Sequence, residues 1–297
     1  MQNVLDRDYL GLVSKVLERG NVRNDRTNTG TLSVFGEQIY YPMDNGFPIL
    51  TSKFVSMKTV ATELKWFLRG DTNIKYLLEN DCNIWTGDAY EQYQRVWNYD
   101  LDDPISKEEF VKRIKSDDNF ARTWGSLGPI YGHQWRKKSQ YGVQRDQIKI
   151  LLDGLKNDPY SRRHIVNSWD VMNLDKMTLP PCHYSFQCYV NDGYLELQWI
   201  QRSADLFLGV PFNLASYGLL LHLLCYETGL KPGKLGVSLG DTHIYQNHIP
   251  QCYEQLEQKT YPLPSIEILS SDILNGEFEY RLVNYKHSPA IKAPLNN

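Results

Sequence analysis

The stretch that decides the fold is Tyr184-Ser-Phe-Gln-Cys-Tyr-Val190, followed by Asn191-Asp-Gly193 and Tyr194-Leu-Glu-Leu-Gln-Trp-Ile200. Both outer runs are rich in aromatic and branched residues, as β-strands are. The Asp-Gly pair between them favours a tight two-residue turn. The sequence therefore predicts an antiparallel hairpin centred on this turn.

The predicted hairpin brings Cys182 opposite Arg202, because each of them lies ten residues from Asp192. A thiolate is favoured beside a fixed cation, which makes the cysteine a nucleophile. Pro180-Pro181, just before the thiol, favours a rigid extended backbone. We therefore predict that Cys182 is reactive. The other cysteines have no such partner and are predicted to be structural: Cys82, Cys188, Cys225 and Cys252.

Composition narrows the class of protein. The chain has 297 residues, 41% of them apolar and 23% charged, as in soluble globular proteins. Its formal charge of −3 predicts no basic surface for nucleic acid. We find no signal-peptide pattern and no apolar run of membrane length, so we expect a cytoplasmic protein. Five cysteines without C-x-x-C spacing predict neither a disulfide framework nor a metal site.

Hydrophobic periodicity predicts several elements. Residues 5–19 form an amphipathic helix ended by Gly20, residues 31–41 form strands, and residues 59–68 form a second helix. Residues 212–228 are apolar almost all round, which predicts a central helix, capped by Gly229.

Strands and helices without strict alternation indicate an α+β fold, and we expect one catalytic domain over residues 1–297. The chain has no glycine-rich dinucleotide motif or P-loop. Residues 88–120 are strongly charged and are predicted to be a peripheral insertion with a short helix near 106–115.

Three groups of arginines are candidates for an anion site: Arg26, Arg162-Arg163 and Arg202 with Ser203. Arg26 lies in a Gly/Thr/Asn loop whose amides and hydroxyls suit an anion. Together the three groups would hold a phosphate dianion by bidentate contacts. The alternative is that each group belongs to a solvated surface.

Polar residues beside the apolar helix and in a later strand leave alternatives open. Asn213 is either the N-cap of the helix or an amide that pairs with a uracil-like edge. Asp241, His243 and Tyr245 face one way along a strand. The spacing of His243 and His248 suits neither a strand face nor a helical turn, which argues against a metal site.

A set of ordered segments resembles the thymidylate synthase family. The match runs from about residue 5 to the end of the chain, and such a set is highly specific. The segments are Asn24-Asp-Arg-Thr27, Gly46-Phe-Pro48, Glu63-Leu-Lys-Trp-Phe-Leu68, Gly70-Asp-Thr-Asn73, Leu127-Gly-Pro-Ile-Tyr-Gly132, Leu179-Pro-Pro-Cys-His183, Gln201-Arg-Ser-Ala-Asp205, Phe207-Leu-Gly-Val-Pro-Phe-Asn213, Gly240-Asp-Thr-His-Ile-Tyr245 and Ile291-Lys-Ala-Pro294.

The resemblance implies a thymidylate-synthase-like fold: a large mixed twisted sheet with helices on one face and a second subunit's sheet packed against the other. It implies methylation of dUMP at C5, with 5,10-methylene-tetrahydrofolate as carbon and hydride donor. Cys182 would add to C6 of the uracil. Arg162 and Arg163 would complete the phosphate site of the neighbouring subunit of a homodimer.

The resemblance also implies roles for individual residues. The catalytic set would be Cys182, Glu63, Arg202, Tyr131, His183, Asn213 and Asp205. The substrate-binding set would be Arg26, Arg162, Arg163, Gln201, Arg202, Ser203, Asp205, Asn213, His243 and Tyr245. The folate-binding set would be Lys53, Ile84, Trp85, Leu179, Asp205, Gly209, Phe212 and Asn297.

Four segments depart from the family pattern: Thr51-Ser-Lys-Phe54, Thr86-Gly87-Asp88, Asn167-Ser-Trp-Asp170 and the polar end Pro294-Leu-Asn-Asn297. A polar tail would close less tightly over folate, which keeps open an alternative in which water instead of hydride captures the methylene group, giving 5-hydroxymethyl-dUMP. Trp85 favours reduction.

Two activities of other classes are weaker alternatives. A cysteine hydrolase would need a base beside Cys182, yet the adjacent His183 is expected to point to the opposite face of an extended run. RNA binding would need an aromatic platform or a basic stripe, and the sequence has neither.

Overall fold

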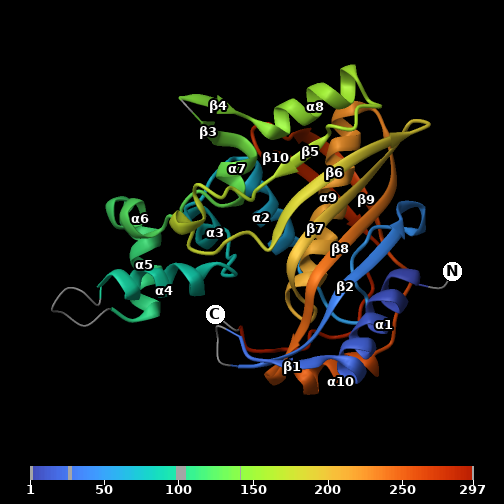
Figure 1. Ribbon diagram of the computed structural model, residues 1–297, viewed down its shortest axis with the longest axis horizontal. Coiled ribbons are helices and arrows are strands. Elements are labelled where there is room, and N and C mark those ends of the chain that lie inside the picture. The colour runs from blue at the N-terminus through green and yellow to red at the C-terminus, as the bar shows by residue number, and fades with distance from the viewer. Residues whose placement is uncertain (1–2, 26–28, 98–104, 141, 296–297) are drawn as a thin grey trace.

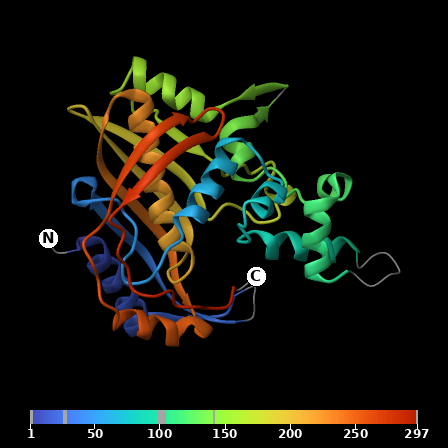
Figure 2. The same cartoon turned by 180° about the vertical axis from the view of Figure 1, so that it is seen from behind.

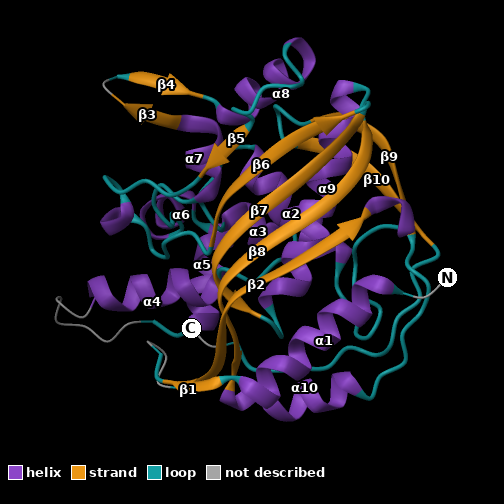
Figure 3. Ribbon diagram, turned by 45° about the vertical axis from the view of Figure 1, so that its right-hand side comes forward, coloured by secondary structure: helices purple, strands orange, loops and turns teal. Residues whose placement is uncertain are grey.

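The centre of the molecule is one six-stranded mixed sheet. The structure, a computed structural model, describes residues 3–25, 29–97, 105–140 and 142–295. The strand order is β1 (Asn21–Arg23), β2 (Thr31–Pro42), β8 (Lys231–Tyr245), β7 (Tyr194–Asp205), β6 (His183–Asn191) and β5 (Ile165–Asn167). Strands β7 and β8 run parallel and the other neighbours antiparallel. This confirms the expected mixed sheet, which crosses the molecule in Figures 1 and 3.

The predicted hairpin is confirmed as β6 and β7. Asp192 and Gly193 have φ angles of 47° and 80°, the left-handed values that a tight hairpin turn requires. The register pairs His183 with Gln201. One step further, the Arg202 amide donates to the Cys182 carbonyl at 2.8 Å. Cys182 and Arg202 are therefore neighbours as predicted, although a bulge between His183 and Ser185 shifts the register by one residue from the one that the turn sets.

Helices cover one face of the sheet. The central helix is α9 (Gly209–Thr228), which packs on β7 and β8, with α2 (Met57–Leu68) beside it and α1 (Val4–Arg19) against β2. Figure 2 shows the hairpin of β9 (Ser265–Asp272) and β10 (Glu277–Val283) lying across the far side of α9. Helix α9 is therefore enclosed between two sheets, which explains why it is apolar almost all round.

The bounds of these helices match the predictions within three residues. Helix α1 ends at Gly20 as predicted. Helix α2 begins two residues early because Ser56 accepts a hydrogen bond from the Thr59 amide at 3.3 Å. Helix α9 begins at Gly209 and ends at Gly229, whose φ of 74° is left-handed.

Close packing of α9 requires a small residue. A Cβ atom at Gly218 would lie 2.3 Å from Cγ of Pro48. By length and composition α9 is able to cross a membrane, but 72% of its eighteen-residue window is buried inside the protein. We therefore assign it as a core helix.

Among the residues that the structure describes, no helix lies on the opposite face of the sheet (Figures 1 and 3). Large side chains on its strands are exposed: Tyr40, Ile165, Tyr189 and Ile200. Exposed apolar groups spread over one face are typical of a surface that another protein covers.

A lobe of helices lies to one side of the sheet (Figure 1): α3 (Lys75–Glu79), α4 (Thr86–Trp97), α5 (Lys107–Ser116) and α6 (Asp118–Trp124). Helix α5 is the predicted short helix. The lobe has its own aromatic cluster, in which the Tyr93 ring lies 5.2 Å from Phe110 and 5.0 Å from Trp124. The described parts of the segment predicted as an insertion, 88–97 and 105–120, fall within it, and residues 98–104 lie outside the described residues.

The remaining elements join these layers. They are α7 (Tyr131–Lys137), β3 (Lys138–Gln140), β4 (Val143–Arg145), α8 (Gln147–Asn157), α10 (Ile249–Leu256) and the short 3-10 turns Met43–Asn45, Leu174–Lys176 and Gln246–His248.

Candidate active site

A cavity of about 780 Å³ lies at the open end of the β6–β7 hairpin. Strands β7 and β8, helices α2 and α9 and the start of α4 all contribute to its wall. Sixteen of the predicted site residues line it: Glu63, Ile84, Trp85, Tyr131, Leu179, Cys182, His183, Gln201, Arg202, Ser203, Asp205, Gly209, Phe212, Asn213, His243 and Tyr245. The tertiary structure therefore gathers side chains that span 183 positions of the chain.

The thiol of Cys182 and the guanidinium of Arg202 meet in this cavity. Arg202 Nη2 lies 3.9 Å from Cys182 Sγ. The same guanidinium is held by the chain just before the thiol, since Nη2 donates to the Pro180 carbonyl at 2.7 Å and Nε to the Pro181 carbonyl at 3.0 Å. The two carbonyls orient the cation toward the sulfur. A fixed cation at this distance favours the thiolate form of the cysteine.

Tyr131 and His183 support the backbone around the thiol. The Cys182 amide donates to the Tyr131 hydroxyl at 2.7 Å, and the Tyr131 ring stacks on His183 with centroids 4.2 Å apart. His183 Nδ1 lies 2.9 Å from the Tyr217 hydroxyl. Burial lowers the pKa of His183 to about 3, so this imidazole is neutral at pH 7. A neutral, stacked ring in hydrogen-bond contact with Tyr217 is arranged as a positioning group.

Glu63 supplies a buried carboxyl from α2. Its side chain is 9% exposed, and Oε1 accepts a hydrogen bond from Trp85 Nε1 at 2.8 Å. Burial raises the pKa of Glu63 to about 7, while the bond from Trp85 opposes the rise. A carboxyl that titrates near neutral pH both accepts and donates protons under working conditions.

Asp205 orders the turn that leads into α9, and Asn213 lies inside the helix. Asp205 Oδ1 accepts the amides of Phe207 at 2.9 Å and Leu208 at 3.1 Å. Helix α9 begins at Gly209, so Asn213 lies in its second turn. The interpretation of Asn213 as an N-cap is therefore wrong, because the preceding Gly-Val-Pro-Phe already belongs to the helix. Its amide lines the cavity instead.

Asp241, His243 and Tyr245 face the cavity together, as their alternation along the strand predicted. The rings of His243 and Tyr245 meet edge to face, with centroids 5.2 Å apart. The Asp241 carboxylate is paired with Arg23 at 2.9 Å. That pairing was not predicted.

Some predicted residues lie elsewhere. Arg162 and Arg163 are exposed in the turn before β5 and do not line the cavity. Lys53 is buried, with its ammonium on the Phe207 carbonyl and 3.6 Å from the centroid of the Phe207 ring. Arg26 and Asn297 lie outside the described residues.

Other residues of the wall were not predicted as site residues: Arg23, Asn24, Asp25, Thr31, Asp88, Pro180, Leu208, Asp241, Ala293 and Leu295. Asp241 was marked by the strand alternation, and Asn24-Asp25 by the loop that precedes Arg26. No pattern in the neighbouring sequence marks Arg23 or Asp88 as a site residue, because they reach the cavity wall only when elements distant in the sequence pack together.

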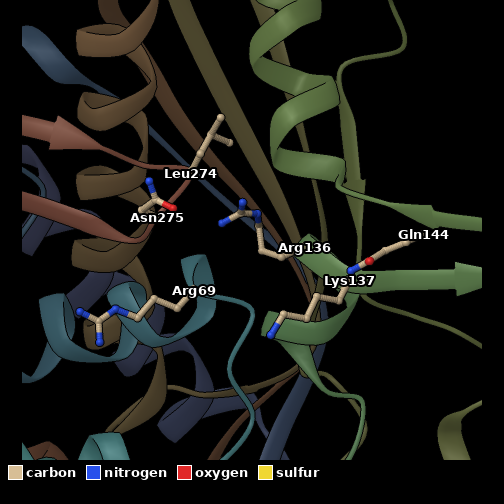
Figure 4. A pocket seen from close by; sticks show the side chains of 6 residues that line it. All are labelled: Arg69, Arg136, Lys137, Gln144, Leu274 and Asn275. Atoms are coloured by element: carbon tan, nitrogen blue, oxygen red, sulfur yellow. The ribbon is translucent and has the colours of Figure 1, made fainter.

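A second cavity, of about 330 Å³, is shown in Figure 4 and is lined by Arg69, Arg136, Lys137, Gln144, Leu274 and Asn275. Arg136 makes a bidentate pair with Asp146 at 2.9 and 2.8 Å, and Arg69 pairs with Glu277. Two of its three cations are therefore neutralised, and its lining includes no nucleophile. The larger cavity is the candidate active site.

The described part of the chain contains no cluster of side chains that could bind a metal ion. Over residues 3–25, 29–97, 105–140 and 142–295, no group of three or more His, Cys, Asp or Glu side chains is arranged to hold an ion.

Comparison with known proteins points the same way as the geometry. The family model described as thymidylate synthase matches residues 7–297. Proteins named thymidylate synthase are similar over nearly the whole chain. That of Mycoplasma pneumoniae is 46% identical, covering 97% of this chain and 99% of its own. That of Staphylococcus haemolyticus is 45% identical, covering 99% of each. That of Mesoplasma florum is 48% identical over 89% of this chain and 90% of its own.

Proposed function

The chain belongs to the thymidylate synthase family and is an enzyme of that kind, a methyltransferase; we propose that it converts dUMP to dTMP with 5,10-methylene-tetrahydrofolate as second substrate. The observation that carries the proposal is the Cys182 thiol 3.9 Å from the Arg202 guanidinium, in the wall of one cavity with Asn213 and Glu63.

The reaction begins on the nucleotide. The Cys182 thiolate forms a bond to C6 of the uracil, and the C5–C6 electron pair moves onto the C4 carbonyl, so that C5 becomes an enolate carbon. Asn213 pairs with the base edge, since an amide both donates and accepts there. After C5 is substituted, loss of its proton and expulsion of the thiolate restore the ring. Methylene-tetrahydrofolate supplies the one-carbon unit and the hydride when bound.

Glu63 moves the protons of these steps. With its pKa raised to about 7, the carboxyl stabilises the enolate oxygen by donating a proton and takes a proton back later, directly or through water. Tyr131 holds the Cys182 amide, and His183 stacks on Tyr131. These contacts keep the sulfur at one distance from the ring while charge moves.

Folate binds against the apolar lining residues of the same cavity, which are Leu179, Ile84, Trp85 and Phe212. Asp205 hydrogen-bonds the pterin, next to Gly209 at the start of α9. The lining residues fit a flat, partly aromatic ligand with one polar edge. Lys53 and Asn297 belong to the same proposed folate set, although Lys53 does not line the cavity.

The phosphate is held by Arg202, Ser203 and Arg26 of one subunit, next to Gln201, and by the partner subunit's Arg162 and Arg163. Support comes from the exposure of Arg162 and Arg163 in the turn before β5, and from the uncovered sheet face with exposed Ile165 and Tyr189. A homodimer that packs sheet against sheet buries that face. His243 and Tyr245 bind the sugar hydroxyl. We also propose a cytoplasmic location, consistent with five free cysteines.

One assay tests the reaction. The protein is incubated with dUMP and methylene-tetrahydrofolate, the product is weighed by mass spectrometry, and dihydrofolate is followed by absorbance. We expect dTMP and dihydrofolate in equal amounts. A product one oxygen heavier than dTMP, formed without dihydrofolate, would identify the hydroxymethylase alternative instead.

A second assay tests the shared site. Cys182→Ser protein is mixed and refolded with an Arg162→Ala/Arg163→Ala double variant, each inactive alone. Random pairing makes half the dimers mixed, and one of their two sites is intact, so about a quarter of wild-type activity returns. Recovery of no activity would exclude a site built from both subunits.

A further inference from the structure

The Asp241 carboxylate joins three strands at the edge of the cavity. Its Oδ1 accepts from Ser33 Oγ on β2 at 2.7 Å and lies 3.1 Å from His243 Nδ1 on β8. Its Oδ2 accepts from Arg23 Nη1 on β1 at 2.9 Å. The pKa of Asp241 is lowered, first by the hydrogen bond with His243, so the group is a carboxylate at neutral pH.

The contact with Asp241 decides which face of the His243 ring is presented to a ligand. An ionised carboxylate only accepts hydrogen bonds, so it selects the tautomer in which Nδ1 carries the proton. The Asp241 backbone carbonyl, a second acceptor, lies 3.3 Å from the same nitrogen and favours the same tautomer by a longer contact. The neutral ring then has Nε2 as an acceptor. His243 is buried and lines the cavity, so Nε2 is the nitrogen available to a hydroxyl that donates.

The contact with Arg23 extends this arrangement to the neighbouring loop. Residues 24–30 connect β1 to β2 and carry Arg26, the predicted phosphate ligand. One end of the loop is tied to β8 by the pair of Arg23 and Asp241, and the other end by the Gln246 amide, which donates to the Gly30 carbonyl at 2.9 Å. The Arg23 side chain is 58% exposed, so the pair adds little to stability, and its consequence is geometric.

We propose that Asp241 is a positioning residue, which fixes His243 as an acceptor for the sugar 3′-hydroxyl and is itself held in place by Ser33 and Arg23. The proposal rests on the function proposed above. It makes one carboxylate the main determinant of the tautomer in which His243 meets the nucleotide. Substitution of Asp241 should therefore raise KM for the nucleotide and leave kcat, which reports the chemical step, nearly unchanged.

The test compares two nucleotides. In Asp241→Asn, which keeps the size of the side chain, the amide no longer selects one tautomer of His243, and only the longer contact with the backbone carbonyl still favours a proton on Nδ1. We expect KM for dUMP to rise about tenfold, the loss of about one hydrogen bond, with kcat within about threefold. With 2′,3′-dideoxy-UMP, which has no 3′-hydroxyl, the same substitution should change KM less than about threefold. An equal loss on both nucleotides would refute the positioning role.

Two further variants complete the design. Arg23→Gln should raise KM for dUMP by about threefold, as expected for an exposed pair. Glu267→Gln is the matched control, since Glu267 accepts from Arg281 at 2.9 Å in the β9–β10 hairpin, away from the cavity. It should leave KM unchanged.

The tautomer itself is measured by ¹⁵N NMR of the free protein, with the His243 signal assigned by its loss in His243→Asn. We expect protonated Nδ1 in the wild type and a smaller share of that tautomer in Asp241→Asn, where the backbone carbonyl is the remaining acceptor. Protonated Nε2 in the wild type would overturn the proposal. This measurement requires no turnover, so it decides the positioning role even if dUMP proves not to be the substrate.

Discussion

The open end and the middle of the β6–β7 hairpin each contain a cysteine, with opposite surroundings. At the open end, Cys182 faces a cavity and lies 3.9 Å from a guanidinium. In the middle, Cys188 pairs across the ladder with Leu197 and is 1% exposed. Burial raises the pKa of Cys188 far above its ordinary value, with Cys225 contributing. The same side chain is therefore a nucleophile at one place and a core residue six positions later, because only one of them has a cation and access to a ligand.

The largest effect is expected at the two cysteines themselves. Cys182→Ser should lower kcat by at least about a thousandfold, since a hydroxyl is a far weaker nucleophile at this site. Cys188→Ser should leave kcat per folded molecule unchanged and lower the free energy of unfolding by about 1–3 kcal/mol, since it buries a hydroxyl in an apolar site. Steady-state kinetics and urea denaturation check both. If Cys188→Ser lost activity while remaining folded, the assignment of Cys182 as the nucleophile and Cys188 as a purely structural residue would be contradicted.

Arg202 provides the next test. Arg202→Lys keeps a positive charge but cannot make the same planar contacts with the carbonyls of Pro180 and Pro181. We expect kcat/KM to fall about a hundredfold and the rate of Cys182 alkylation by iodoacetamide to fall with it. Alkylation should also be blocked by dUMP in the wild type. An unchanged alkylation rate would mean that the guanidinium does not activate the thiol.

Burial changes the pKa of Glu63 as it changes that of Cys188, but here the buried group lies in the cavity wall. Its pKa is about 7 in the folded protein and 4.5 ordinarily, so the folded state holds its proton more tightly. This stabilisation is fully present below pH 4.5 and is lost as the pH rises through 7. Relative to Glu63→Gln, the wild type should lose on the order of 3 kcal/mol over that range.

The stability difference is measured by urea denaturation of both proteins at several pH values between 4 and 8. A difference that stays constant with pH would mean that the pKa of Glu63 is not raised in the folded protein. In activity, Glu63→Gln should lower kcat about tenfold to a hundredfold, as for loss of one general acid–base group.

Trp85 gives the smallest and most specific effect. Its indole N–H bonds Glu63 and opposes the rise in that pKa. Trp85→Phe removes the donor and keeps an aromatic ring, so the pH profile of kcat should move upward by up to about one unit. A profile that moves downward would contradict the assigned role of the indole.

Local patterns in the sequence predicted much of this arrangement. The Asp-Gly turn set the hairpin register from Asn191 and Tyr194 to Ser185 and Ile200, because strand pairing about a tight turn is a matter of counting. A bulge between His183 and Ser185 then shifts the register by one residue, and with that shift Cys182 lies beside Arg202. The strand alternation correctly placed Asp241 on the face of His243 and Tyr245. In contrast, the N-cap interpretation of Asn213 failed, because the helix begins at Gly209, about one turn before Asn213.

The sequence by itself determined the elements and the hairpin, since these depend on neighbours along the chain or across one turn. Only the tertiary structure decided the pKa of Glu63, the contact of Arg23 with Asp241 and the burial of Lys53 away from the cavity. Burial and convergence depend on how helices α2 and α9 pack on strands β7 and β8. No local sequence pattern predicts how far that packing removes water from a particular carboxyl group, and this removal of water is what raises its pKa.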